Sequence, residues 1–148
     1  MSAAVNLNFY KDGFVESDVQ QTSSAPVFNV GGWSDWQVAA VKKLLRFGRL
    51  KPNWDSYGSS PISFEVIRTA INLLAQASFE DLPNPSILPV SGGGVQYEWV
   101  KGDHEVQIEI KPDCSIVYLI AKNDEPLKEE RLVDLGEVER LLSWLMLG

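Results

Sequence analysis

The spacing of apolar residues along this chain changes from a helical period to a strand period near residue 87. In the first half, apolar residues recur at steps of three and four: Trp33, Trp36, Ala40, Leu44 and Phe47. This spacing predicts a helix with one apolar face. Ser34 followed by Gln37 has the sequence of a capping box, so we expect the helix to begin near Ser34 and to end at Gly48.

A second helix is expected between residues 60 and 82. Ser60 can cap it, and Pro61 suits the first helical position. The buried stripe would consist of Val66, Ala70, Leu73, Leu74 and Ala77, with Ile67 and Ile71 beside it.

Polar and apolar residues alternate over 95–100, 105–110 and 115–121, and a shorter apolar run covers 87–90. Alternation predicts strands, and the short connections between them predict an antiparallel meander with one buried and one solvated face. Gly92, Gly93 and Gly94 lie between strands, so a hairpin turn is favoured over a phosphate-binding loop, which a helix would follow. Residues 123–126 are expected to break the sheet, with 130–133 as a short edge strand.

The last helix is expected to start at Asp134, where an acidic cap precedes Glu137 by three residues. Trp144, Met146 and Leu147 fall outside its main apolar stripe, so they are buried either in a dimer interface or in a larger core. The predicted class is α+β: two N-terminal helices, a three- to four-stranded antiparallel meander and a C-terminal helix, packed as a two-layer sandwich.

Residues 1–32 have a weaker pattern than the rest. Residues 5–10 and 27–30 read as short strands, 11–13 as a turn and 20–25 as a polar, flexible link. We expect either a small hairpin or a weakly ordered arm that seeks a partner. Residues 33–148 are expected to form a single α+β domain.

Composition favours a soluble cytoplasmic protein. The single cysteine, Cys114, excludes an intrachain disulfide and a zinc cage built on cysteines. We expect no signal peptide, because the first residues lack its basic and long apolar regions, and no apolar run is long enough for a membrane span. His104, the only histidine, is expected in an exposed turn, and it is too little for a common zinc site.

The net charge of −7 is unevenly distributed. Residues 1–74 carry seven Lys or Arg against six Asp or Glu, whereas residues 75–148 carry six against fourteen. A basic run, namely Lys42, Lys43, Arg46, Arg49 and Lys51, interrupts this acidity. The acidic balance argues against general binding of nucleic acid and favours a basic partner.

The most unusual segment is 53–61, Asn-Trp-Asp-Ser-Tyr-Gly-Ser-Ser-Pro, followed later by Gly-Gly-Gly-Val-Gln-Tyr-Glu-Trp at 92–99. It resembles an uncharacterised family of small bacterial proteins with an Asn-Trp-Asp-x-Tyr-Gly-x-x-Pro segment and a later Gly-Gly-x-x-x-Glu-Trp segment. The similarity covers roughly residues 44–120. It implies a bacterial or phage-related cytosolic domain and carries over no catalytic residue.

Two interpretations of the 53–61 segment remain open. Trp54 and Tyr57 are large, rigid, amphipathic side chains that make good binding anchors, with Asp55 between them as an acceptor. Alternatively, Asp55 caps its own turn and Trp54 fills the core, since turn-forming residues explain most of the segment.

On the predicted sheet, Glu98 and Glu109 face the same polar side of neighbouring strands. With Asp55 they make the best available acid–base or metal constellation, and a solvated sheet face is the alternative. Glu105 lies about 13 Å from Glu109 along its strand, which is too far for a catalytic pair.

The sequence therefore favours a non-enzymatic protein-binding or regulatory module, resembling an antitoxin or inhibitor, whose acidic surface meets a basic toxin, nuclease or defence component. Its binding residues would be Trp54, Asp55, Tyr57, Glu98, Glu109 and Trp144, without catalytic residues, cofactor or metal. A homodimer through the C-terminal helix is a further expectation. The alternative is a small hydrolase or ligand-binding domain that uses carboxylates near the 53–61 segment.

Overall fold

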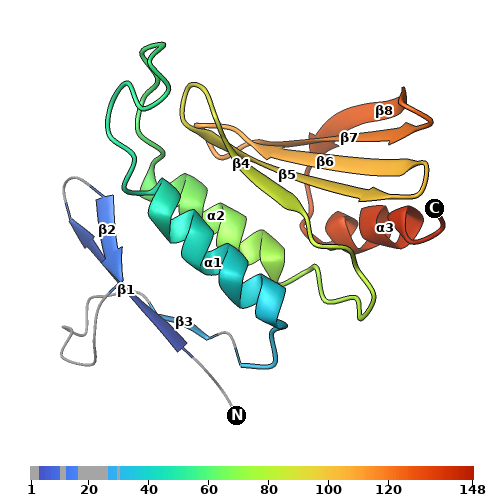
Figure 1. The fold of residues 1–148 in the computed structure, drawn as a ribbon, viewed down its shortest axis with the longest axis horizontal. Coiled ribbons are helices and arrows are strands. Elements are labelled where there is room, and N and C mark those ends of the chain that lie inside the picture. Colours follow the sequence, from blue (N-terminus) through green and yellow to red (C-terminus); the bar gives the residue numbers. More distant parts are fainter. Residues whose placement is uncertain (1–3, 11–12, 17–26, 30) are drawn as a thin grey trace.

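The computed structural model describes residues 4–10, 13–16, 27–29 and 31–148, and its centre is a five-stranded antiparallel sheet. The strands follow chain order: β4 (Ser86–Val90), β5 (Gly94–Lys101), β6 (His104–Ile110), β7 (Ile116–Lys122) and β8 (Glu125–Leu132). Three helices lie on one side of this sheet, namely α1 (Asp35–Phe47), α2 (Phe64–Leu74) and α3 (Gly136–Leu145) (Figure 1). The α+β class is confirmed, but the predicted three to four strands are too few.

A second, smaller sheet precedes the helices. It consists of β1 (Ala4–Tyr10), β2 (Gly13–Glu16) and β3 (Val27–Asn29), in the order β2-β1-β3, and lies on the α1 side of the molecule (Figure 1). The strands expected at 5–10 and 27–30 therefore pair with each other, and β2 was not expected. The predicted turn at 11–13 and the link at 20–25 fall wholly or partly outside the described residues.

Helix α1 begins as its sequence predicts. Ser34 Oγ accepts from the backbone N–H of Gln37, and Ser34 N–H donates to Gln37 Oε1 at 2.9 Å, which completes the capping box. The nitrogen of the Gln37 side-chain amide binds the end of α2: Nε2 donates to the carbonyl oxygens of Leu74 and Ala77 at 2.8 and 3.2 Å. One buried glutamine thus sets the start of α1 and the approach of α2, whose last turn holds Leu74.

Helix α2 starts at Phe64 with Ser63 as its cap, so the prediction of a start at Ser60 and Pro61 is wrong. The carbonyl oxygen of Ser60 accepts a hydrogen bond from Trp54 Nε1 at 3.0 Å. Ile62 is buried at 4% exposure. These contacts fix residues 60–62, which precede the helix and have no regular secondary structure. The predicted apolar stripe of α2 is buried as expected.

The large sheet has one face in the core and one face open. Tyr97, Trp99, Val106 and Ile108 are fully buried beneath the helices. On the opposite face, Gln96 pairs with Glu109 and Glu98 with Gln107, and all four are partly exposed. We call this second surface the open face. The predicted alternation of β5 and β6 is therefore confirmed, and the 91–93 segment is the predicted hairpin turn.

Strand β8 was predicted wrongly as a break at 123–126 and a short edge strand at 130–133. Asn123 and Asp124 instead form a tight turn, both with positive φ (53° and 62°), and β8 pairs with β7 from Glu125 to Leu132. Two residues with positive φ match the twist of a hairpin, and Asn and Asp tolerate this conformation well.

Both edges of the large sheet carry features that oppose further pairing. Strand β4 contains Pro89, which has no N–H to donate. Strand β8 is exposed over residues 125–131, contains Pro126 and holds a Lys128–Glu130 ion pair at 3.5 Å. Charged side chains and proline are the usual protection of edge strands.

Helix α3 closes the core, and its contacts correct the prediction for His104. This residue is 6% exposed rather than in an exposed turn. Its ring stacks on Trp144 at 4.1 Å between centroids, and Nδ1 lies 3.0 Å from the Trp144 carbonyl oxygen. Trp144 and Met146 pack against the core, whereas Leu147 is 78% exposed. Helix α3 starts at Gly136 rather than at the predicted Asp134. Its N-cap residue is Leu135, which makes no side-chain cap bond, although Asp134 Oδ1 accepts a hydrogen bond from Gly136 N–H at 2.9 Å.

None of the helices in the described part of the chain has the length and apolar character needed to cross a membrane.

Candidate functional site

The 53–61 loop joins α1 to α2 and is held by its own polar side chains. Asn53 N–H donates to the carbonyl oxygen of Ser59 at 2.8 Å, and Gly58 N–H donates to Asn53 Oδ1 at 2.7 Å. Asn53, Ser56 and Gly58 have positive φ (62°, 65° and 82°). Since only short polar residues and glycine adopt this conformation readily, the turn-forming composition of the segment fixes its shape.

Asp55 is the centre of the loop. Its Oδ1 accepts from the backbone N–H groups of Tyr57 and Ser59 at 2.9 and 3.2 Å. Its Oδ2 accepts from Ser59 Oγ at 2.5 Å and from Ser91 Oγ. Both carboxylate oxygens thus bind groups of the protein itself. This agrees with the interpretation in which Asp55 caps its own turn.

The loop is docked on the turn between β4 and β5. Besides the Asp55–Ser91 contact, Gly92 N–H donates to Ser59 Oγ at 3.0 Å. A Cβ atom at Gly93 would lie 3.2 Å from the Pro61 carbonyl oxygen. The two unusual segments of the sequence, 53–61 and 92–99, therefore meet in space, and glycine at 93 permits their close approach.

The hydrogen bonds to Asp55 also set its chemistry. The hydroxyl of Ser59, and then that of Ser91, lower the pKa of Asp55 well below its usual 3.8, because they stabilise the ionised carboxylate. A carboxylate with so low a pKa stays ionised and is a weak proton acceptor. Asp55 is thus suited to hold the loop and unsuited to act as a general base.

The two aromatic residues of the loop lie in different environments. Trp54 is partly exposed, with its Nε1–H satisfied by Ser60, and it is not part of the hydrophobic core. Tyr57 is 91% exposed. Its backbone N–H is bonded to Asp55, so a fixed loop presents this side chain to the solvent. The alternative in which Trp54 fills the core does not agree with this placement.

Glu98 and Glu109 lie on the open face as expected, on diagonal positions of β5 and β6. Glu105 belongs to the same face, and we call Glu98, Glu105 and Glu109 the acidic stripe. Neither the Lys128–Glu130 ion pair nor the His104–Asp103 contact involves the stripe, so within residues 31–148 its partly exposed carboxylates have no cationic partner, and Glu105 accepts a hydrogen bond from Gln107 Nε2.

Apolar side chains flank the acidic stripe. Leu88 is opposite Gln96 on β4 and is 49% exposed. On the other flank, Val117 pairs with Glu109 and Leu119 with Gln107, and both are partly exposed. Val100, which pairs with Glu105, is 53% exposed. The open face therefore combines negative charge with accessible apolar surface.

The loop and the acidic stripe do not converge into a catalytic pocket. Asp55 bonds to its own loop and to Ser91, and neither Asp55 nor Glu98 lines either of the cavities described for residues 31–148. Among the residues that the structure describes, no group of three or more His, Cys, Asp or Glu side chains is close enough together to hold a metal ion. Trp144 lies apart from the loop, since it belongs to α3 and stacks on His104 at the end of β6 that is opposite the 91–93 turn.

Ser59 and Ser91 are the site residues that the sequence did not single out. Ser59 is 5% exposed and connects Asp55 to Gly92. Ser91 follows β4 directly and precedes the glycine run. Ser59 lies within the 53–61 segment and Ser91 directly precedes the 92–99 segment, so their places in the two unusual segments are the signal that could have linked them.

Comparison of the chain with protein-family models, with curated proteins and with solved structures found no match.

Proposed function

We propose that this protein is a non-enzymatic binding or regulatory module that recognises a basic protein through the open face and the 53–61 loop. The observation that carries the proposal is the exposure of Tyr57, which is 91% accessible on a loop held by hydrogen bonds on both of its sides. A large aromatic side chain with little freedom to lose is a favourable anchor.

The position of the loop supports a single surface. The loop is docked on the 91–93 turn, which also begins β5. Gln96 is the first residue with a polar side chain on the open face after this turn, and it pairs with Glu109 of the acidic stripe. The loop therefore lies at the end of the sheet that holds Glu109, and the rest of the stripe extends from there along the open face through Glu98 to Glu105.

The chemistry of the surface selects the partner. Three carboxylates without cationic partners attract a basic surface, which accelerates encounter and excludes acidic proteins. Burial of the apolar flank of Leu88, Val117 and Leu119 in a complex would contribute favourable free energy, because it removes apolar surface from water. We therefore propose a partner that carries Lys or Arg among apolar residues. The resemblance noted for 53–61 suggests that it is a bacterial or phage toxin, nuclease or defence component in the cytoplasm.

A comparative pull-down tests this function. Wild-type protein, Tyr57→Ala and the pair Glu98→Gln/Glu109→Gln would be used as bait in a bacterial lysate, with quantitative mass spectrometry of the bound proteins. The matched control is Glu137→Gln/Glu139→Gln on α3, which removes the same charge elsewhere. We expect a basic protein that is depleted by both surface variants and retained by the control. Equal recovery with all baits would contradict the proposal.

A further inference from the structure

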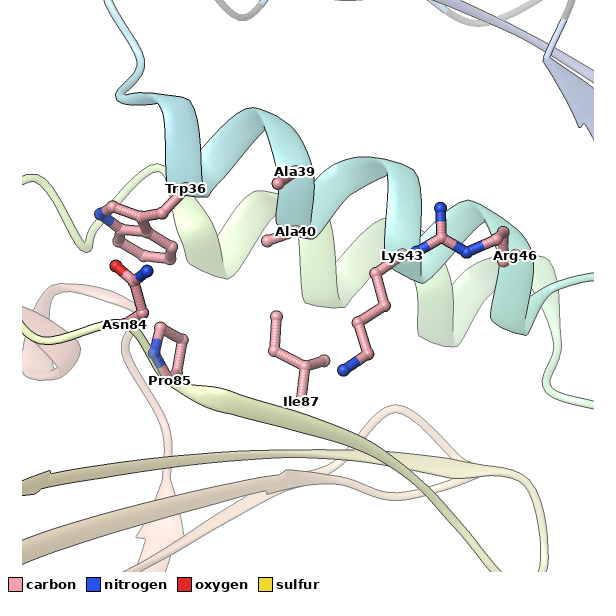
Figure 2. A pocket seen from close by; sticks show the side chains of 8 residues that line it. All are labelled: Trp36, Ala39, Ala40, Lys43, Arg46, Asn84, Pro85 and Ile87. Atoms are coloured by element: carbon pink, nitrogen blue, oxygen red, sulfur yellow. The ribbon is translucent and has the colours of Figure 1, made fainter.

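A groove runs between α1 and the edge strand β4, on the side of the sheet that faces the helices. Its volume is about 270 Å³. Ala40 of α1 and Ile87 of β4 face each other across its middle, with Ala39 beside Ala40, and Figure 2 shows the longer polar and aromatic side chains toward its two ends. At one end the Trp36 ring lies beside the Asn84 amide, and at the other end are Lys43 and Arg46.

The charge of the groove is unusual for an acidic protein. No Asp or Glu lines it, and neither Lys43 nor Arg46 takes part in an ion pair within residues 31–148. Lys43 is partly buried, and Figure 2 shows its side chain reaching from α1 toward β4. Two cations three residues apart on one helix, both lining a concave surface, are well placed to bind an anionic group.

The other end of the groove has the chemistry of ring recognition. Trp36 is partly exposed, so one part of its indole is accessible for stacking while the rest packs against the core. Asn84 offers one donor and one acceptor side by side, the arrangement that pairs with the N6 and N7 edge of adenine. Trp36 and Lys43 are seven residues apart on α1, which corresponds to about 10 Å along the helix axis.

The edge strand itself excludes an added β-strand as the occupant. Pro85 lines the groove and Pro89 lies further along β4, and neither has a backbone N–H to donate to a new strand. The volume of about 270 Å³ is near the lower limit of small-molecule pockets. Both features favour a small molecule over a peptide strand.

We propose that this groove binds an adenine nucleotide, with the base against Trp36 and Asn84 and the phosphates at Lys43 and Arg46. The nucleotide has a flat ring with a donor–acceptor edge at one end and a multiply charged group at the other, as the groove does. The site is independent of the proposed binding of a basic protein, because the groove lies on the helix side of the sheet and the acidic stripe on the open face.

Isothermal titration calorimetry of the full chain with ADP tests the proposal, with adenosine and inorganic pyrophosphate as probes of each half. We expect ADP to bind at least about tenfold more tightly than either half, because both ends of the groove are then occupied. Absence of ADP binding up to about 1 mM would overturn the proposal. Pyrophosphate binding as tightly as ADP would also overturn it, since the ring would then contribute nothing.

Variants locate the binding. Lys43→Gln/Arg46→Gln should weaken ADP by at least about tenfold. The control Lys42→Gln/Lys51→Gln removes two charges from the same basic run but outside the groove, and it should leave the affinity within about twofold. Asn84→Leu should weaken ADP binding and leave pyrophosphate binding unchanged. An equal loss with both double variants would mean nonspecific attraction to the basic run and would refute the groove.

Discussion

Asp55 accepts a hydrogen bond from Ser91, a residue 36 positions further along the chain. This contact ties the loop between the helices to the first hairpin of the sheet. Ser59 reinforces it from the loop side, because its hydroxyl donates to Asp55 and accepts from Gly92 N–H. The orientation of the loop that carries Tyr57 therefore depends on the β4–β5 hairpin, which is distant from it in the sequence.

Replacement of Ser91 with Ala should release this side of the loop. Asp55 would lose one of its hydroxyl donors, so its pKa should rise toward the usual value while the fold is retained. An NMR titration of the Asp55 carboxyl carbon measures the shift, and amide exchange at Gly92 reports the loosened contact. Ser86→Ala, at the start of β4, is the control. An unchanged Asp55 titration in Ser91→Ala would show that the serine does not stabilise the carboxylate.

The pH dependence of stability should have an acid limb that comes from Asp55. Its pKa is lower in the folded state than the usual 3.8, so its contribution is complete above that value and is lost as the pH falls toward the folded-state pKa. Asp113, whose pKa the Ser115 hydroxyl lowers, acts in the same direction. Urea unfolding at several pH values below 5 should show a shallower decline for Asp55→Asn than for the wild type. Parallel curves would assign the acid limb to other groups.

Replacement of His104 with Ala should destabilise the protein by about 2–3 kcal/mol. The substitution removes a buried ring that stacks on Trp144 and leaves the Trp144 carbonyl oxygen without that partner. Denaturant unfolding followed by Trp fluorescence measures the change. Asp103→Asn, in the adjacent exposed turn, should remain within about 0.5 kcal/mol of the wild type. A His104→Ala protein as stable as this control would show that the stacking is dispensable.

Replacement of Gly94 with Ala should cost about 2–3 kcal/mol, because the new Cβ would lie 2.7 Å from the Ile110 carbonyl oxygen on the neighbouring strand. Backbone atoms of a paired strand cannot move aside easily. Gly136→Ala at the start of α3 is the opposite case, with its nearest neighbour at 3.4 Å, and should be neutral or stabilising by up to about 1 kcal/mol. Thermal unfolding of both variants compares them. A Gly94→Ala protein with wild-type stability would mean that β5 and β6 separate more readily than their register implies.

Replacement of Tyr57 with Ala should leave the free energy of unfolding within about 0.5 kcal/mol of the wild type, since the side chain is 91% exposed. Its effect on partner capture would then be a direct effect on recognition. A clear loss of stability would instead assign Tyr57 a structural role and weaken the proposed function.

Local patterns predicted the parts of the fold that depend on local chemistry. The capping box at Ser34 and the alternation along β6 were enough to locate α1 and the centre of the sheet. The start of α2 was wrong because Trp54 binds the Ser60 carbonyl oxygen, a contact that a search for caps does not consider. Only the end of β8 was predicted, as a short edge strand, and residues 125–129 were missed because an exposed edge with charges on both sides has no alternation to detect.

The sequence indicated several residues of the candidate site but not the contacts between them, and it did not indicate Ser59 or Ser91. The exposure of Tyr57 and the shared face of Glu98 and Glu109 agree with what residue type and strand period indicated, and a binding role for them stays a prediction. The bond between Asp55 and Ser91 could not be predicted, because it depends on how the helices pack on the sheet. The burial of His104 was missed for the same reason, since α3 provides the cover.

The protected edges of the large sheet limit how this molecule can associate. Pro89 on one border and the charged, proline-containing β8 on the other oppose the joining of neighbouring copies through their backbones. Concentrated solutions should therefore resist fibre formation by this route. A complex formed on the large sheet would therefore use side chains on a broad surface, and its selectivity would follow from side-chain chemistry, which can change by point mutation without altering the backbone.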